Sequence, residues 1–182
     1  MGIATDKEKN IAELKGFYEG LPGIYKSAYY GRRIKKLLYD ETLSLGKMAP
    51  DFSLPDTTGH AVSLSSFRGK YVFLDFWASW CGPCLKENKF IKQAWQMYKN
   101  KGLVVLAVSI DSPESKDKWL GMIRNDQLPW AQVIDDENKI KRMYKVVSIP
   151  KNFLLDPEGR IIAKDLRGTR LDAALAKVFE RE

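Results

Sequence analysis

The chain contains few of the residues that metal centres and disulfide-rich folds require. Its 182 residues include two cysteines and a single histidine, His60, which we expect to be exposed at a turn. A structural zinc site needs about four ligands of these kinds, which argues against one here. No stretch is apolar over the roughly 20 residues that span a membrane, and the first residues show no apolar core of an export signal.

The charge of the chain is mixed rather than one-sided. Lysine and arginine number 30 against 23 aspartate and glutamate, which gives a formal net charge of +7. The basic residues are scattered among acidic ones, and this is typical of a solvated surface. No nucleic-acid-binding motif accompanies them, so we expect no nucleic-acid partner. The length suits one domain with an extension.

The two cysteines stand together at a change of pattern. Cys81 and Cys84 flank Gly82-Pro83, after a strand-forming run over 71–77 and before a helix-spaced segment over 85–101. Such a pair, where a strand gives way to a helix, is typical of a redox site. Unpaired N–H groups and the helix dipole at a helix N-terminus stabilise a thiolate. A first-turn proline fits, because it loses no intrahelical hydrogen bond.

A purely structural disulfide is the other interpretation of this pair. A ring this small removes little entropy from the unfolded chain, about 2 kcal/mol in the chain-entropy model. Inert buried thiols would also not call for the surrounding Trp80, Gly82 and Pro83. Redox chemistry is therefore the favoured function of the pair.

One charged residue interrupts the apolar run over 71–77. This residue is Asp75, in a segment otherwise typical of a strand covered on both faces. A carboxylate in such a place is costly unless it is hydrogen-bonded or kept neutral. We therefore expect the pKa of Asp75 to be raised.

The segment before this domain has a different pattern. Apolar residues recur at helical spacing between residues 6 and 21, and Pro22-Gly23 breaks the pattern. A second helix is predicted over 24–39, and Gly46 opens the main domain. We expect an N-terminal helical segment over 1–45, as the end of a larger preceding domain, and a redox domain over 46–182.

Several motifs together carry a family resemblance. The WCGPC sequence after a strand with Asp75 resembles thioredoxin, and the wider pattern resembles the TlpA/ResA group of thioredoxin-like proteins. The residues behind the narrower match are Ala49-Pro50-Asp51-Phe52, Gly59-His60, 64–70, 75–80, Glu87 and Ser148-Ile149-Pro150. The resemblance implies an α/β thioredoxin fold, with a mixed central sheet flanked by helices. It also implies an inserted αβ element between Asp111 and Pro150.

The same resemblance implies roles for individual residues. Cys81 attacks a substrate disulfide, and Cys84 resolves the mixed disulfide. Asp75 and Glu87 are candidates to take the Cys84 proton. The substrate-binding surface is expected from Trp80, Gly82, Pro83, Ile149 and Pro150, with a cis peptide between the last two. No metal or dissociable cofactor is implied, because the redox-active group is the Cys81–Cys84 disulfide.

The expected function is therefore that of a thiol–disulfide oxidoreductase acting as a protein-disulfide reductase. Its partners would be disulfide-containing proteins and an upstream electron donor. The family implies an extracytoplasmic, periplasmic location, a membrane tether in the full-length protein and a part in cell redox homeostasis. Lys151 departs from the family, where a threonine is usual, and this puts the charge of the substrate groove in question.

Two other functions stay open at this point. Ala49-Pro50-Asp51-Phe52 also opens peroxiredoxins, which act as peroxidases, but these place a threonine three residues before the reactive cysteine. Ala78 stands in that position here. The second is a non-catalytic module that uses the thioredoxin fold for docking.

Overall fold

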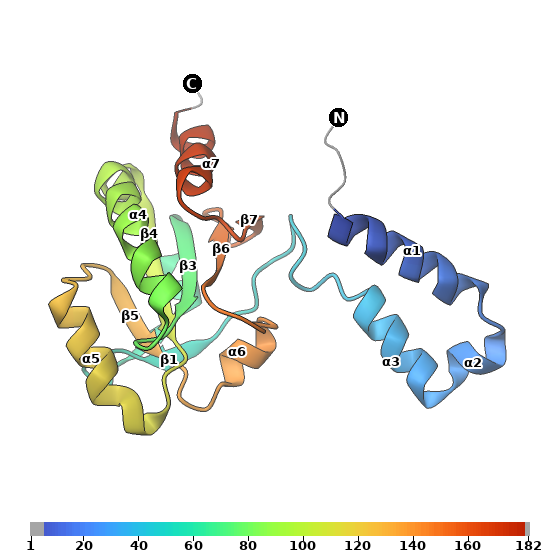
Figure 1. Cartoon of the computed structure of the whole chain (residues 1–182). Helices are drawn as coiled ribbons and strands as arrows, with labels where there is room; N and C mark the ends of the chain where they lie inside the picture. The colour runs from blue at the N-terminus through green and yellow to red at the C-terminus, as the bar shows by residue number, and fades with distance from the viewer. Residues whose placement is uncertain (1–5, 181–182) are drawn as a thin grey trace. The chain divides into compact units, whose positions relative to one another are not determined.

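The computed structural model describes residues 6–180 of the chain (Figure 1). The chain divides into two compact units between Thr42 and Leu43. Residues 1–5 of the predicted segment 1–45, and residues 181–182 of the predicted domain 46–182, lie outside the described part. None of the helices within residues 6–180 is long and apolar enough to cross a membrane.

From residue 6 onward, the first unit contains three helices. These are α1 (Asp6–Gly20), α2 (Gly23–Ser27) and α3 (Tyr29–Leu38). The prediction of one continuous helix over 24–39 is wrong, because Ala28 is extended (φ −62°, ψ 160°) and separates α2 from α3. The interruption brings the two helices close together: a Cβ at Gly31 would lie 2.0 Å from the carbonyl oxygen of Tyr25.

The second unit is built around a five-stranded sheet in the order β5-β4-β3-β6-β7. Its strands are β3 (Tyr71–Trp77), β4 (Leu103–Ser109), β5 (Ala131–Ile134), β6 (Lys151–Leu155) and β7 (Ile161–Lys164), and its helices are α4 (Gly82–Tyr98), α5 (Lys116–Asn125), α6 (Lys139–Met143) and α7 (Thr169–Phe179). β1 (Ser53–Pro55) and β2 (Ala61–Ser63) form a separate hairpin. Short 3₁₀ turns occur at Leu64–Phe67, Lys99–Lys101 and Pro113–Ser115. The predicted insertion comprises α5, β5 and α6.

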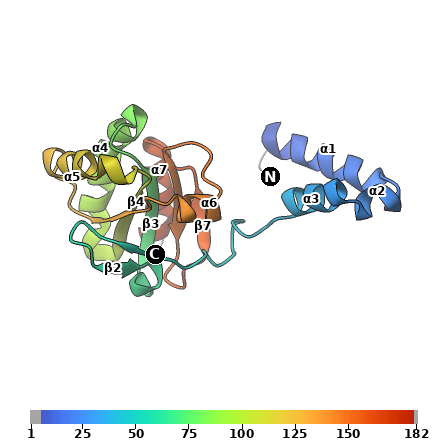
Figure 2. The ribbon, with the colours of Figure 1, turned by 90° about the horizontal axis from the view of Figure 1, so that it is seen from below.

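Side chains along β3 point alternately to the two faces of the sheet, and their contacts show which helices cover one of these faces. The Tyr71 ring packs on Phe179 of α7, which stacks on Tyr98 of α4, so α4 and α7 share one face. Figures 1 and 2 show α5 near α4, and the two are linked by a hydrogen bond of 3.4 Å between Asn88 and Asp126.

The opposite face of β3 is covered by aromatic side chains. Phe76 packs on Tyr144, which follows α6, at a ring-centroid distance of 5.3 Å. Phe52 and Phe153 also contact the Tyr144 ring. Trp119 and Trp130 of the inserted element are also buried.

The strand directions gather four chain segments at one edge of the sheet. β3, β4 and β5 are parallel, whereas β6 is antiparallel to both β3 and β7. The ends of β3, β4 and β7 therefore lie at the same edge as the start of β6. This edge receives the start of α4, Asp111, Pro150 and the loop before α7.

The boundary between the units generates a prediction about truncation. Removing residues 1–42 should leave a domain with a single cooperative thermal transition. Removing residues 1–49 should lower the free energy of unfolding clearly, because it deletes backbone hydrogen bonds from Gly46 to Ile161, Ile161 to Lys47 and Ala49 to Gly159. Each is worth about 1 kcal/mol. Calorimetry on the two truncated proteins measures both effects. A non-cooperative transition after removal of residues 1–42 would contradict the division into two units.

Candidate active site

The two cysteines form a disulfide at the start of α4. Their Cα atoms are 5.3 Å apart. Cys81 is the N-cap residue of the helix, and its Sγ accepts a hydrogen bond of 3.2 Å from the backbone N–H of Cys84. Pro83 occupies the first turn, as predicted. The sulfur of Cys81 thus binds a backbone N–H that has no partner within the helix, and a thiolate would be stabilised there after reduction.

Exposure distinguishes the cysteines only slightly. Cys81 is 4% exposed and Cys84 is 1% exposed, whereas Gly82 and Pro83 between them are exposed. Both cysteines are thus buried, and the two residues between them lie at the surface. Cys84 lies inside the hydrophobic core.

A buried carboxylate holds the turn that leads to Cys81. Asp111 follows β4 and is fully buried. It accepts hydrogen bonds from Ser79 N (2.8 Å), from Ser79 Oγ (2.7 Å) and from Ser109 Oγ (2.6 Å). These bonds tie the turn after β3 to the end of β4. The sequence analysis assigned no role to Asp111, although an acidic residue directly after a buried strand was a signal for one.

Asp75 lies on β3 and points to the same face of the sheet as Tyr71, the face that α4 and α7 cover. Its side chain is buried, and its Oδ1 has no protein hydrogen-bond partner among the described residues. Burial raises the pKa of Asp75 to about 7; the charge of Arg167 opposes this shift, and the charge of Glu87 adds to it. The pKa is therefore raised, as the apolar pattern of the strand predicted.

Glu87 lies one helical turn after Cys84 on α4. It is partly exposed, and its Oε2 accepts a hydrogen bond of 3.0 Å from the backbone N–H of Gly168. Its charge acts on Asp75, so the structure brings the two predicted carboxylates into one electrostatic environment. Gly168 was not recognised from the sequence, because no motif marks it.

The predicted substrate surface surrounds a cis-proline. The Ile149–Pro150 peptide is cis. Trp80 is 65% exposed and Val147 is 96% exposed. A pocket of about 240 Å³ adjoins them, lined by Trp80, Ile110, Lys141, Val146, Val147, Ser148 and Ile149. Of these residues, the sequence analysis had assigned Trp80 and Ile149 to the substrate surface. The large exposed apolar side chain of Val147 adds to the surface that a peptide could contact.

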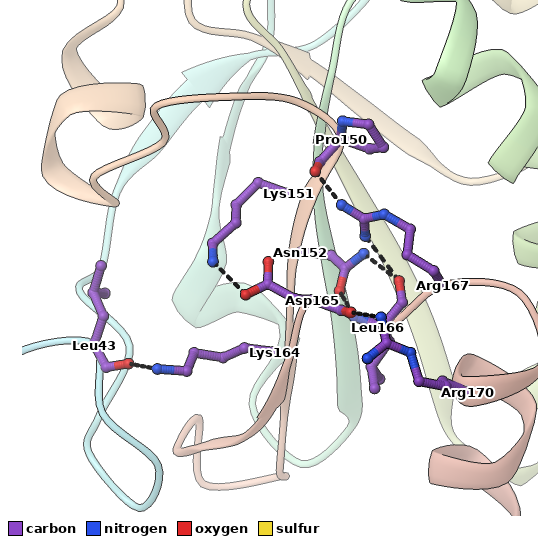
Figure 3. Close-up of polar contacts among 9 residues, drawn as sticks. All are labelled: Leu43, Pro150, Lys151, Asn152, Lys164, Asp165, Leu166, Arg167 and Arg170. Carbon is purple, nitrogen blue, oxygen red and sulfur yellow. Dashed lines mark hydrogen bonds and ion pairs between the residues drawn. The ribbon is translucent and has the colours of Figure 1, made fainter. Parts of the chain in front are cut away.

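Lys151 forms an ion pair instead of presenting a free ammonium. Its Nζ lies 2.7 Å from Asp165 Oδ2 (Figure 3) and 5.3 Å from the ring centroid of Phe153. The departure from threonine at this position is thus accompanied by a compensating charge. Asp165 is part of the loop before α7, which the sequence analysis did not single out.

Metal-binding groups do not gather in the described part of the chain. No three histidine, cysteine, aspartate or glutamate side chains within residues 6–180 lie close enough to hold an ion. His60 is exposed at the turn between β1 and β2, with its Nδ1 2.7 Å from Thr58 Oγ1. The exposed position at a turn is the one expected from the sequence.

Comparison with known proteins agrees with this geometry. A family model described as the AhpC/TSA family matches residues 45–164. The thiol-disulfide oxidoreductase ResA of Bacillus subtilis strain 168 is 32% identical over 152 residues, which cover 84% of this chain and 79% of ResA.

Solved structures show the same similarity. The thioredoxin domain of a thiol-disulfide oxidoreductase from Bacteroides vulgatus has a TM-score of 0.70 at 36% identity, covering 75% of this chain and 99% of that domain. A thiol:disulfide interchange protein from Bacteroides sp. also has a TM-score of 0.70 at 36% identity, covering 77% of this chain and 93% of that one. The predicted thioredoxin fold is confirmed.

The raised pKa of Asp75 predicts how stability depends on pH. The folded pKa is about 7 and the ordinary value is 3.8. Between these values the folded state keeps a proton that the unfolded state loses, so the free energy of unfolding falls as pH rises from about 4 to about 7. Asp75→Asn removes this dependence. Relative to the wild type, the variant should gain up to about 4 kcal/mol over this range.

Chemical denaturation at pH 4, 5.5, 7 and 8.5 measures this gain. Asp136→Asn, at an exposed aspartate, is the matched control and should show none. A constant difference between Asp75→Asn and the wild type at all four pH values would mean that the carboxyl group titrates normally.

Proposed function

Because the chain belongs to the AhpC/TSA family and to its TlpA/ResA-like thiol–disulfide oxidoreductases, we propose that it reduces disulfides in partner proteins. The chain is a thiol–disulfide oxidoreductase, and proteins with disulfides are its substrates. The proposal concerns the direction of exchange and the role of each residue. The observation that carries it is the placement of Cys81 Sγ at the N-terminus of α4, beside an exposed apolar surface.

The reduced enzyme transfers two electrons in two exchange steps. The Cys81 thiolate attacks one sulfur of a substrate disulfide, that S–S bond breaks, and the second substrate sulfur leaves as a thiolate. Cys84 then loses its proton and attacks Cys81 Sγ. The bond between Cys81 and the substrate breaks, and the first substrate sulfur leaves as a thiolate. The enzyme then holds the Cys81–Cys84 disulfide present in this structure.

The second step needs a proton acceptor near Cys84. Asp75 suits this role, because a carboxyl group with a pKa of about 7 is an effective base near neutral pH. Glu87 follows Cys84 by three residues, so the two side chains lie on the same side of α4. We assign the proton to this pair of carboxylates, with Asp75 as the buried member.

We assign the substrate-binding surface to the exposed residues around the disulfide. Trp80, Gly82 and Pro83 are exposed around the disulfide, and the Ile149–Pro150 segment lies beside the pocket that Trp80 lines. A partner peptide would lie in this apolar pocket while its sulfur meets Cys81. The redox-active group is the disulfide itself, and no dissociable cofactor enters these steps.

The cycle requires a partner on each side. Disulfide-bearing proteins accept the electrons, and an upstream dithiol donor must reduce Cys81–Cys84 again. From the family we infer an extracytoplasmic location, in the periplasm, with a membrane tether in the full-length protein and a part in cell redox homeostasis. No nucleic acid takes part.

Variants of the two cysteines test their separate roles. Cys81→Ser should abolish the reduction of insulin disulfides. Cys84→Ser should keep the first attack and accumulate a mixed disulfide, because its resolving thiol is absent. Mass spectrometry of the products measures both, with the double variant as the control without adduct. Faster alkylation of Cys84 than of Cys81 by iodoacetamide at pH 7 would reverse the assignment.

The same assay separates the alternatives. A docking module would show no turnover with insulin. A peroxidase would consume hydrogen peroxide at the expense of a thiol donor, with a rate that exceeds its rate on insulin.

The direction of exchange predicts a low reduction potential. Strong oxidants of this chemistry owe their potential to a heavily stabilised thiolate, but Gly82-Pro83 supplies no charged group between the cysteines. Lys151 is paired with Asp165. The potential should therefore lie nearer thioredoxin's roughly −270 mV than the roughly −120 mV of a strong oxidant.

Equilibration against glutathione mixtures measures the potential. Lys151→Thr is the matched variant and should shift it by no more than about 20 mV, because an ion pair at the surface contributes about 1 kcal/mol or less. A wild-type potential above about −180 mV would show that the protein is not a reductant.

A further inference from the structure

The loop between β7 and α7 contacts three parts of the active site, and Figure 3 shows its contacts with Lys151 and Asn152. Leu166 N donates a hydrogen bond to Asn152 Oδ1 on β6 at 2.8 Å, and Asn152 Nδ2 donates one to Leu166 O at 2.9 Å. Asp165 binds Lys151, and Gly168 N binds Glu87 on α4. The loop thus links the strand after the cis-proline to the helix that carries the cysteines.

Arg167 extends this link to the cis-proline itself. Its guanidinium donates a hydrogen bond to the carbonyl oxygen of Leu166 at 2.8 Å and another to the carbonyl oxygen of Pro150. Figure 3 shows the guanidinium between these two carbonyl groups. Because its planar donors meet two fixed acceptors, the position of the charge is defined.

The same guanidinium lies on the side of the fold where Asp75 is buried, because Asp75 pairs with Asn152 in the sheet and Asn152 is hydrogen-bonded to Leu166, the neighbour of Arg167. Two charged groups influence Asp75: Arg167 from this loop and Glu87 from α4. The two residues that pair with Asp75 in the sheet carry no charge: they are Asn152 on β6 and Ala107 on β4. Arg167 therefore supplies the positive charge that offsets burial and Glu87.

We propose that Arg167 is a positioning residue for thiol–disulfide exchange, which holds the Pro150 carbonyl in place and keeps Asp75 available as a charged proton acceptor for Cys84. This inference rests on the proton-acceptor role proposed above for Asp75. When Cys84 attacks Cys81 Sγ, its thiol proton passes to the Asp75 carboxylate and the substrate leaves as a thiolate. Arg167 touches neither the proton nor the sulfurs, and it acts through the charge state of Asp75.

The test follows the resolving step as a function of pH. Reduced enzyme is mixed with a small disulfide peptide, quenched with acid at intervals between pH 5 and pH 9, and the mixed disulfide is quantified by mass spectrometry. In the wild type, its decay rate should rise with pH with a midpoint at about 7, where Asp75 ionises. Arg167→Gln should move this midpoint upward by about one pH unit or more, because a nearby opposite charge lowers a carboxyl pKa by about 1–3 units.

Conservative and control variants separate charge from structure. Arg167→Lys keeps the charge and should keep the midpoint within about half a unit, which is below the shift expected from charge loss. Arg170→Gln removes a similar charge three residues later, at a side chain that contacts the carbonyl of Asp165, and should leave the profile unchanged. Arg167→Met is the second neutral variant if Arg167→Gln does not fold. A displacement of one unit or more in Arg167→Lys would itself contradict the proposal.

The double variant identifies the route of the effect. In an Asp75→Asn background, Arg167→Gln should produce no further shift of the midpoint. An equal shift in that background, or an unchanged midpoint in Arg167→Gln alone, would overturn the role of Arg167 while leaving the exchange activity intact. If Asp75→Asn alone leaves the pH profile unchanged, the proton-acceptor role of Asp75 fails, and the role of Arg167 fails with it.

Discussion

The buried carboxylate of Asp111 holds the turn on which the active site depends. It accepts three hydrogen bonds from Ser79 and Ser109, and these join the end of β3 to the end of β4. A fully buried acceptor with several donors is rigid, because any movement leaves a polar group unsatisfied. The turn therefore has one arrangement, in which Trp80 lies at the surface and Cys81 caps α4. The redox chemistry follows from that placement.

A second carboxylate is held under opposite conditions. Asp75 lies in an apolar strand with one oxygen lacking a protein partner in the described structure, and its pKa is raised to about 7 by burial. Such a group destabilises the folded state when it is charged, but it can exchange protons near neutral pH. Asp111 is held by three hydrogen bonds, whereas Asp75 Oδ1 has none in the described structure, and our proposal gives the proton-transfer role to Asp75 alone of these two. Glu87 and Arg167, which act on Asp75 with opposite charges, adjust this balance.

Much of the domain could be predicted from the sequence. The apolar run over 71–77, the paired cysteines and Pro83 predict a strand, a redox turn and a helix, and the structure has β3 and α4 there. The raised pKa of Asp75 also follows from its apolar neighbours alone. The helix predicted over 24–39 is divided at Ala28. Helical spacing does not reveal this break or the close approach of Gly31 to Tyr25 that accompanies it. Apolar periodicity indicates a helix but not where it is interrupted.

The sequence by itself determined the strand over 71–77, the helix after it and the redox motif of Cys81 and Cys84, because these depend on neighbouring residues. Only the tertiary structure decided which polar groups surround them. Ser79 meets Asp111 across 32 residues, Pro150 meets Arg167 across 17, and Lys151 meets Asp165 across 14. No local pattern marks such pairs. They form because β3, β4, β6 and β7 bring their ends to one edge of the sheet, and that edge exists only after the strands have paired.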